Sequence, residues 1–300
     1  MARSNYHNPV MARQTVDLLR PCLRSGITVD ATFGGGGHSR LILAADRKAR
    51  VLAIDRDPDA AAQAAGMGKR LRFRSADFRR MDAVLDEEGI DEIAGAVFDL
   101  GVSSHQLDVG ERGFSYHRAG PLDMRMGPDA PLDAGAIVNT WDRNDLAGTF
   151  RRYGEERHAG RIADAIVAAR PFTDTAQLAA VVADAMPARS RRSGHPARRT
   201  FQALRIAVND ELGALAEGLD VALRVLRPGG RIVVIAYHSL EDRIVKRRFV
   251  SGARGCICPP DLPMCGCGQT PELLLVTRKA MRPEPEEVEA NPRSRSARLR

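Results

Sequence analysis

The chain has 300 residues, of which 44% are hydrophobic, so it can bury a sizeable core and form about two domains. Its 45 Lys and Arg residues against 38 Asp and Glu give a net charge of +7, which favours an anionic partner such as nucleic acid. The amino-terminal residues contain no signal-like apolar run. The longest apolar runs, such as 232–237, are too short for a membrane span. We therefore expect a cytoplasmic protein with reduced cysteines and no membrane partner.

The first hundred residues alternate between helix and strand patterns. Asn8 and Pro9 are typical of a helix start, and this helix should end near Leu19, before Pro21. Strand patterns follow at 27–31, 51–55, 71–75 and 94–100, at intervals of about 20 residues. This alternation predicts βαβ units and a parallel sheet.

The rest of the chain leaves and then re-enters this pattern. Residues 101–199 show no clear strand, but helical patterns occur near 152–169 and 175–186. Apolar residues recur every three or four positions from 201 to 226, which predicts one long amphipathic helix with Thr200 as its N-cap. Strands are expected at 231–237 and 273–276. The sequence therefore predicts a doubly wound α/β domain, residues 1–104 and 200–300, interrupted by a mainly helical insertion at 105–199.

The segment Asp30-Ala-Thr-Phe-Gly-Gly-Gly-Gly-His-Ser39 is the most informative one. Four consecutive glycines between a strand and a helix indicate a sharp turn or the close approach of a ligand. Asp55 ends the next strand 18 residues after Gly37, near the spacing at which an open α/β sheet places an acid on a ribose hydroxyl. The loop and Asp55 together predict a nucleoside-containing cofactor at the carboxyl ends of the strands.

Two classes of cofactor would offer a ribose to Asp55. A nicotinamide dinucleotide requires G-x-G-x-x-G, but the frames starting at Gly34 and Gly35 end on Ser39 and Arg40. S-adenosylmethionine carries a carboxylate instead of a pyrophosphate, and the free N–H groups at the helix start near His38 suit it. A helix N-terminus disfavours an imidazolium, so we expect His38 to be neutral. A glycine-rich turn without a ligand remains a third interpretation.

Further motifs extend over the whole chain in a recognisable order. They are His7-Asn-Pro-Val10, Leu52-Ala-Ile-Asp-Arg-Asp57, Asp99-Leu-Gly-Val-Ser-Ser104, Gln106-Leu-Asp108, Glu111-Arg-Gly-Phe-Ser115, Gly120-Pro-Leu-Asp-Met-Arg-Met126, Tyr153-Gly-Glu-Glu-Arg157, Arg199-Thr-Phe-Gln-Ala-Leu-Arg205, His238-Ser-Leu-Glu-Asp-Arg243 and Asn291-Pro-Arg-Ser-Arg-Ser296. Together with the glycine segment they resemble the bacterial small-subunit ribosomal RNA methyltransferase H family, also called MraW.

This resemblance implies a Rossmann-like, class I S-adenosylmethionine methyltransferase fold in which the insertion at 105–199 recognises the substrate. It implies methylation of N4 of a cytidine in 16S ribosomal RNA, at the decoding centre of the small ribosomal subunit, by a monomer or a homodimer. DNA is not expected as a partner. DNA and adenine amino-methylases carry an acid or amide followed by Pro-Pro-aromatic where this chain has Asp99-Leu-Gly101.

The resemblance also implies which residues bind S-adenosylmethionine. The methionine end is assigned to Gly36, Gly37 and His38, the ribose to Asp55, the adenine to Phe78, and a contact from the start of the insertion to Gln106. An aromatic residue that follows a strand is also commonly part of the core, so a packing role for Phe78 remains open.

Four residues are candidates for the chemistry itself. Asp99 ends the fourth strand, where open sheets bind ligands, and the resemblance places it at the cofactor. A position beside the target amine and a capping role are both open for Asp99. His238 follows the strand 231–237 and is a candidate acceptor or substrate contact, because its ordinary pKa lies near neutrality. Residues 239–242 match a capping box, so Ser239 is a candidate for either catalysis or capping. Ser104 is a candidate contact with the target base.

Two basic segments and a cysteine cluster remain. Arg189, Arg191, Arg192, Arg198, Arg199 and Arg205, and the tail residues Arg293, Arg295, Arg298 and Arg300, fit either RNA phosphate contacts or exposed, solvated chain. Cys256, Cys258, Cys265 and Cys267 are spaced more tightly than the ligands of structural zinc sites. We therefore expect free cysteines in a loop and no metal.

Three functions stay open at this point. A ribosomal RNA methyltransferase fits the motifs best. A ribosome-assembly or RNA-binding factor with a vestigial cofactor pocket is the second, and intact Gly36, Asp55 and Asp99 argue against it. A nicotinamide oxidoreductase is the third, and it lacks the final glycine of its fingerprint.

Overall fold

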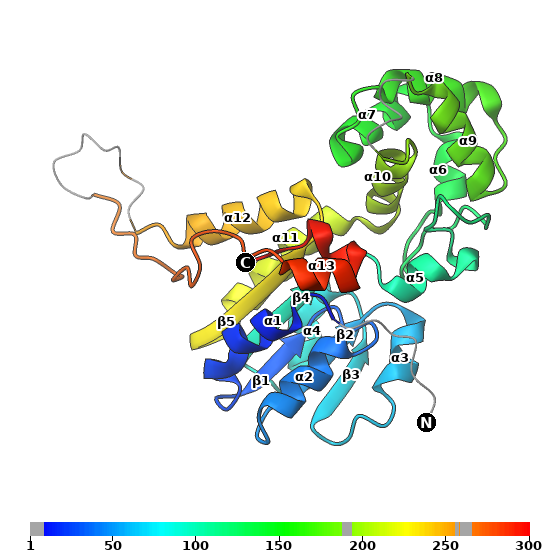
Figure 1. Ribbon diagram of the computed structural model, residues 1–300. Coiled ribbons are helices and arrows are strands. Elements are labelled where there is room, and N and C mark those ends of the chain that lie inside the picture. The colour runs from blue at the N-terminus through cyan, green and yellow to red at the C-terminus, as the bar shows by residue number, and fades with distance from the viewer. Residues whose placement is uncertain (1–8, 188–193, 256–257, 259–265) are drawn as a thin grey trace. The chain divides into compact units, whose positions relative to one another are not determined.

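The computed structural model describes residues 9–187, 194–255, 258 and 266–300. They form two compact units, an α/β unit and a helical unit (Figure 1). The α/β unit extends to Asp55, continues from Ala60 to Gly101, and resumes at Ala214. The helical unit comprises Arg56–Asp59 and Val102–Gly213. The chain therefore leaves the α/β unit twice, once for four residues after the second strand and once for the long insertion.

Six strands form one sheet in the α/β unit. They are β1 (Ile27–Asp30), β2 (Arg50–Asp55), β3 (Leu71–Ser75), β4 (Ile93–Asp99), β5 (Leu226–Ala236) and β6 (Arg298–Leu299), in the order β3-β2-β1-β4-β5-β6. The first five are parallel and β6 is antiparallel to β5. This doubly wound topology confirms the fold predicted from the sequence, and the first four strands lie within one residue of their predicted bounds.

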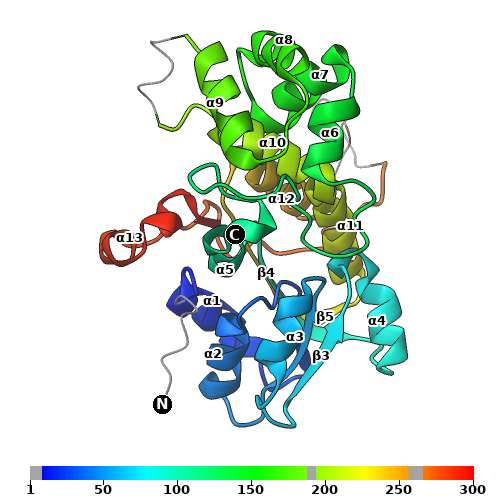
Figure 2. The same ribbon diagram turned by 90° about the vertical axis from the view of Figure 1, so that its right-hand side faces the viewer.

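Helices cover both faces of this sheet (Figures 1 and 2). One core contains apolar residues of α1 (Ala12–Leu19), α2 (Gly37–Ala45) and α3 (Pro58–Ala64). The other contains residues of α4 (Met81–Glu87), α11 (Glu211–Arg224) and α12 (Ser239–Gly252). Strands buried on both faces need side chains that are apolar throughout, and β4 is accordingly buried along Ile93–Phe98. Open sheets of this kind bind ligands where the strand order reverses, which here is between β1 and β4.

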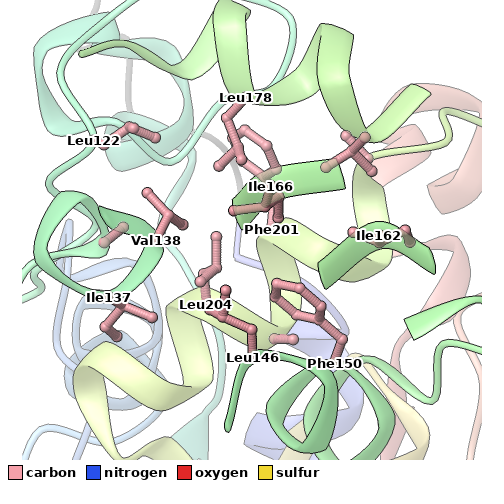
Figure 3. Packing of buried hydrophobic residues seen from close by; sticks show 14 of the residues in the cluster. Leu122, Ile137, Val138, Leu146, Phe150, Ile162, Ile166, Leu178, Phe201 and Leu204 are labelled. Atoms are coloured by element: carbon pink, nitrogen blue, oxygen red, sulfur yellow. The ribbon is translucent and has the colours of Figure 1, made fainter. Parts of the chain in front are cut away.

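The helical unit has a core of its own. Its elements are α5 (Ser104–Asp108), the 3₁₀ turn Gly110–Arg112, α6 (Ala134–Thr140), α7 (Arg143–Gly154), α8 (Ala159–Ala169), α9 (Thr175–Ala185) and α10 (Arg198–Asn209). Asp133, Asp142 and Asp174 cap α6, α7 and α9 by accepting N–H groups of the first turn. Apolar side chains of α6 to α10 then meet in one cluster, among them Phe150, Ile162 and Leu204 (Figure 3).

The helix predicted near 152–169 is wrong, because two helices occupy this region. Helix α7 ends at Gly154, Glu155 takes a left-handed conformation with φ of 47°, and α8 begins at Ala159. A Cβ at Gly154 would lie 2.6 Å from the carbonyl oxygen of Arg199, so α7 and α10 approach each other too closely for a side chain. Packing between helices that are distant in sequence therefore sets this break.

The long helix predicted for 201–226 is also divided. Helix α10 ends at Asn209, Asp210 has a φ of 46°, and α11 begins at Glu211. Apolar residues of α10 belong to the core of the helical unit, whereas those of α11 belong to the core of the α/β unit. One continuous periodic pattern thus serves two cores. The N-cap of α10 is Ala197, and Thr200 lies inside the helix.

The last predicted strand, 273–276, is absent. These residues have no regular structure, and Leu274 is 91% exposed. The edge of the sheet is formed instead by the basic tail, where β6 pairs Leu299 with Ile235 and Arg298 with Ala236. A run of apolar residues alone does not identify a strand, because backbone pairing at a sheet edge places few demands on side chains.

An ion-pair cluster holds the tail against α12. The Asp242 side chain is 8% exposed and accepts hydrogen bonds from Arg298 Nη1 at 2.9 Å and Arg300 Nε at 2.7 Å. Burial alone would raise the pKa of Asp242, but the two guanidinium groups outweigh it and lower this pKa. The carboxylate therefore stabilises the folded chain in its ionised form.

Across the described helices, none combines the length and the low charge that crossing a bilayer would need.

We expect Asp242→Asn to lower the free energy of unfolding by about 2 kcal/mol, because two cations would lose a nearly buried partner. A lowered folded pKa gives stability that is present above the unfolded pKa and is lost as pH falls through the folded pKa. The difference between the variant and the parent should thus be full at neutral pH and shrink under acidic conditions, which chemical denaturation at several pH values would measure.

The matched control is Asp17→Asn. Asp17 also faces two arginines, Arg13 and Arg20, but its side chain is 52% exposed. This change should cost less than about 1 kcal/mol. Equal losses for the two variants would contradict the role given to Asp242.

Candidate functional site

Asp99 connects three elements at the carboxyl edge of the sheet, one through its backbone N–H and two through its carboxylate. The backbone N–H of Asp99 donates to Thr32 Oγ1 at 2.6 Å, just beyond β1. Its Oδ1 accepts the hydroxyl of Tyr237 at 2.7 Å, from the end of β5. Its Oδ2 lies 3.3 Å from Nε2 of His38, in the first turn of α2. Asp99 thus occupies the strand-order reversal where doubly wound sheets bind ligands.

His38 is a buried imidazole with unused hydrogen-bonding capacity. The side chain is 5% exposed, and neither ring nitrogen makes an aligned hydrogen bond within the part of the chain that the structure describes. Burial would lower its pKa, but the Asp99 carboxylate outweighs burial and raises the pKa of His38 above its ordinary value. The direction of this shift is opposite to the one expected from the helix N-terminus alone, and the neutral state of the imidazole remains a prediction. Nε2 faces Asp99, so Nδ1 is the ring atom that a ligand group could pair with.

Tyr237 was missed by the sequence reasoning. It directly precedes His238 at the end of a predicted buried strand, and this position was the available signal. Burial and the Asp99 carboxylate raise the pKa of the Tyr237 phenol well above its ordinary value. The hydroxyl therefore stays protonated and donates to Asp99 over the whole neutral range.

The glycine loop meets the expectation of a tight approach. Gly36 has a φ of 72° as the N-cap of α2, and a Cβ there would lie 2.7 Å from the ring of Phe33. Gly34 has a φ of 51°, and its N–H donates to Asp55 Oδ2 at 2.7 Å. A Cβ at Gly37 would meet Pro9 at 3.1 Å, so this glycine has a packing reason of its own. Asp55 thus ties the loop to the end of β2, at the place where a ribose was expected.

A second buried acid stands at the end of β1. Asp30 is 1% exposed and accepts the hydroxyl of Ser39 at 2.6 Å, which anchors α2 to the strand. Burial raises its pKa, although the hydrogen bond from Ser39 opposes this shift. The sequence reasoning included Asp30 in the glycine motif but gave it no role.

His238 and Ser239 begin α12. The capping box is centred one residue earlier than predicted, because His238 is the N-cap and Glu241 is its reciprocal partner. The Glu241 carboxylate accepts the N–H of Tyr237 at 2.8 Å and lies 3.1 Å from His238 Nε2. His238 therefore has a structural role that the sequence assigned to Ser239, and Ser239 is the first residue of the helix.

Phe78 packs against the core of the α/β unit. It begins the 3₁₀ turn Phe78–Arg80 after β3, and its ring meets that of Phe98 edge-to-face at 5.6 Å. A Cβ at Gly218 would lie 2.6 Å from the Phe78 ring, so α11 closes directly over it. This is the packing role left open by the sequence, and an adenine contact for Phe78 remains a prediction.

Gln106 and Ser104 lie in the helical unit. Gln106 Oε1 accepts the N–H of Ser103 in a capping box, and its Nε2 donates to the buried Asp57 at 2.5 Å. Arg112 adds a contact to Asp57 at 3.1 Å, which explains part of the motif at 111–115. Ser104 is the first residue of α5, and its side chain lies outside the described residues. The contact of Gln106 with a cofactor remains a prediction.

The basic and cysteine segments are only partly covered. Arg189, Arg191, Arg192, Cys256 and Cys265 lie outside the described residues. Arg205 is not an exposed phosphate contact, because its guanidinium pairs with Glu211 through two hydrogen bonds of 2.7 and 2.8 Å. The carboxyl-terminal arginines are part of the fold, as β6 and the Asp242 cluster show.

The α/β unit therefore gathers Gly34, Gly36, His38, Asp55 and Asp99 around one edge of the sheet. This donor set fits S-adenosylmethionine. Asp55 ends the strand at the place where open sheets hold a ribose, and Nδ1 of His38 has no hydrogen-bond partner among the described residues. The N–H groups of Gly34 and Gly36 are taken by Asp55 and Phe33, so they shape the loop. None of these contacts needs a phosphate group on the ligand.

Comparison with known proteins agrees with these observations. The sequence profile of the MraW methylase family matches residues 4–300. The chain is 51% identical to "Ribosomal RNA small subunit methyltransferase H" of Symbiobacterium thermophilum, over 98% of this chain and 95% of the relative. It is 48% identical to the protein of the same name in Heliobacterium modesticaldum, over 98% of this chain and 97% of the relative. It is 49% identical to the one in Carboxydothermus hydrogenoformans, over 98% of this chain and 96% of the relative. These matches, with the sheet topology and the glycine loop, show that the chain belongs to the MraW methylase family.

Proposed function

We propose that this protein uses S-adenosylmethionine to methylate N4 of a cytidine in 16S ribosomal RNA, at the decoding centre of the small ribosomal subunit. The relatives are named as small-subunit ribosomal RNA methyltransferases, which supports the class of substrate. The observation that carries the proposal is the Asp99 carboxylate, held by Tyr237 and His38 beside the glycine loop.

The reaction requires a positioned acceptor more than it requires a strong base. When bound, the cofactor would supply an electrophilic methyl group on a sulfonium: the C–S bond breaks with its electrons left on sulfur, the N4–C bond forms, and one N4 proton passes to solvent. The amine of cytosine is a poor nucleophile because its lone pair is delocalised into the ring. A carboxylate that accepts a hydrogen bond from the amine restores part of this nucleophilicity and fixes its orientation.

Asp99 has the capacity for this role. A carboxylate offers about four lone-pair directions, and Tyr237 and His38 use only part of them. Tyr237 remains a donor at neutral pH and holds the carboxylate in one orientation. In this proposal Asp99 contacts the target amine, Tyr237 positions Asp99, and His238 and Ser239 contact the substrate from the start of α12.

The reaction itself is tested with labelled S-adenosylmethionine and three substrates: unmethylated small ribosomal subunits, naked 16S RNA and duplex DNA. We expect labelled N4-methylcytidine, identified by mass spectrometry of the nucleosides, from ribosomal RNA and not from DNA. Labelled methyl on another position of cytidine or on another base would refute the N4 assignment. Binding of the cofactor without any transfer would move the assignment to a non-enzymatic RNA-binding factor.

Two substitutions separate the acceptor from its support. We expect Asp99→Asn to lower kcat by about 10²–10⁴-fold, since the amide is a weaker acceptor. Tyr237→Phe should lower kcat about tenfold, because one hydrogen bond to a charged group is lost. A positioning role predicts that Tyr237→Phe leaves the KM for RNA and the Kd for the cofactor nearly unchanged.

Asp17→Asn is the control for both variants, because it removes an exposed carboxylate of α1 without touching the site. Steady-state kinetics and cofactor titration distinguish the possibilities. If Tyr237→Phe weakened cofactor binding as strongly as it slowed turnover, its role as a positioning residue would be wrong.

The raised pKa of His38 predicts how cofactor binding depends on pH. The imidazolium is present below the folded pKa, where it attracts the methionine carboxylate, and it is lost as pH rises through that pKa. We expect affinity to fall about three- to tenfold across a midpoint above 6.5, the ordinary pKa of histidine. Isothermal titration from pH 5.5 to 9 would measure it. His38→Gln should give a flat profile, and a profile that keeps its midpoint in this variant would falsify the assignment.

A further inference from the structure

A small pocket lies where the carboxyl-terminal segment passes the start of α12. It has a volume of about 160 Å³ and is lined by Tyr237, His238 and Ser239 together with Arg282, Arg295 and Arg298. Pockets for drug-sized or nucleoside-sized ligands usually measure 300–1,000 Å³. The pocket therefore suits a single small group rather than a whole nucleoside.

The arginines converge on this pocket because of the way the tail folds. Strand β6 pairs with the end of β5, and Met281 bridges to Leu299, which brings Arg282 alongside. The 3₁₀ turn Pro292–Ser296 is fixed by the N–H of Ser294 bonding to Asn291 and by its buried Ser294 side chain, and it presents Arg295. Three guanidinium groups distant from His238 in sequence thus meet on its edge of the α/β unit.

The charge of this pocket is not balanced from within. No carboxylate lines it. Arg298 pairs with Asp242, but Arg282 and Arg295 have no ion-pair partner in the described part of the chain, and both are exposed. Helix α12, which is 14 residues long, adds the positive end of its dipole at Ser239. The guanidinium groups of Arg282 and Arg295, the start of α12 and the hydroxyls of Ser239 and Ser296 line this pocket. Together they form an environment for an anion with several acceptor oxygens.

We infer that this pocket binds a backbone phosphate of the RNA substrate, next to the nucleotide that is methylated. The inference rests on the proposed function and extends it to a particular contact. Tyr237 carries the connection, because its side chain lines the pocket while its hydroxyl donates to Asp99. Phosphate contacts fix the register of a nucleic acid without reading its sequence, so this pocket positions the strand and does not select the base.

The test is a double substitution, Arg282→Gln with Arg295→Gln, assayed with unmethylated small ribosomal subunits and with single-stranded RNA. We expect KM for the subunits to rise about tenfold, with kcat and the Kd for S-adenosylmethionine within twofold of the parent. The slope of log affinity for RNA against log salt concentration should decrease by about 1 to 2, because fewer counterions are released.

The matched control is Arg47→Gln with Lys48→Gln, which removes the same charge from the exposed turn before β2. Thermal unfolding should be unchanged in both double variants, since neither Arg282 nor Arg295 forms an ion pair with any residue that the structure describes. A KM and a salt slope equal to those of the control would overturn the phosphate assignment. The same loss in both variants would overturn it as well, because it would reflect net charge alone.

Failure of the proposed function gives a different result. If the parent protein methylates neither subunits nor RNA, the reaction is wrong, but the salt dependence of RNA binding still tests the pocket. If the parent is active but Arg282→Gln with Arg295→Gln gives the same KM and salt slope as the control variant, the reaction stands and the pocket assignment falls. A parent that does not bind RNA at all would reject both.

Discussion

The carboxylate of Asp99 is the interaction on which the proposed site depends. Through it the end of β4 is connected to Tyr237 at the end of β5 and to His38 on α2, while the backbone N–H of Asp99 binds Thr32 after β1. A carboxylate this close to the core is costly unless donors surround it. The two side-chain contacts meet that cost, and they also fix the direction in which its remaining lone pairs point. The contacts with Tyr237 and His38 therefore both offset the cost of burying the carboxylate and orient it for the proposed contact with the target amine.

The glycine loop is prepared in a similar way. Phe33 fills the space that a Cβ of Gly36 would take, and Asp55 holds the N–H of Gly34. The loop is thus stiff before any ligand arrives, so binding loses little conformational entropy. Among the described residues of the candidate site, the ring nitrogens of His38 and Nε2 of His238 remain without an aligned hydrogen bond, so the unmet polarity of the site lies on two imidazoles.

The sequence was most informative where structure depends on local pattern. Strands β1 to β4 were predicted within one residue, because β1, β2 and β4 are largely buried and apolar and the edge strand β3 alternates between apolar and polar residues. The breaks at Glu155 and Asp210 could not be predicted, since they arise from the close contact at Gly154 and from two separate cores. Gly36, Asp55 and Asp99 were predicted as site residues, because the glycine run, the strand ends and the family resemblance are all visible in the sequence. Tyr237 was not, because its role depends on pairing of β5 beside β4.

The tail shows how one basic segment serves two purposes. Arg298 and Arg300 share the single carboxylate of Asp242, and this pairing holds β6 against α12. Arg282 and Arg295 are carried on the same folded segment but receive no such partner within the described residues. If the tail were basic only for solubility, no pairing of this kind would be needed, and its arginines would point to solvent independently. The anchoring of two arginines instead fixes the position of the other two, so that their charge is directed at a place adjoining Tyr237. The proposed phosphate site would thus be positioned by β6, a strand of two residues.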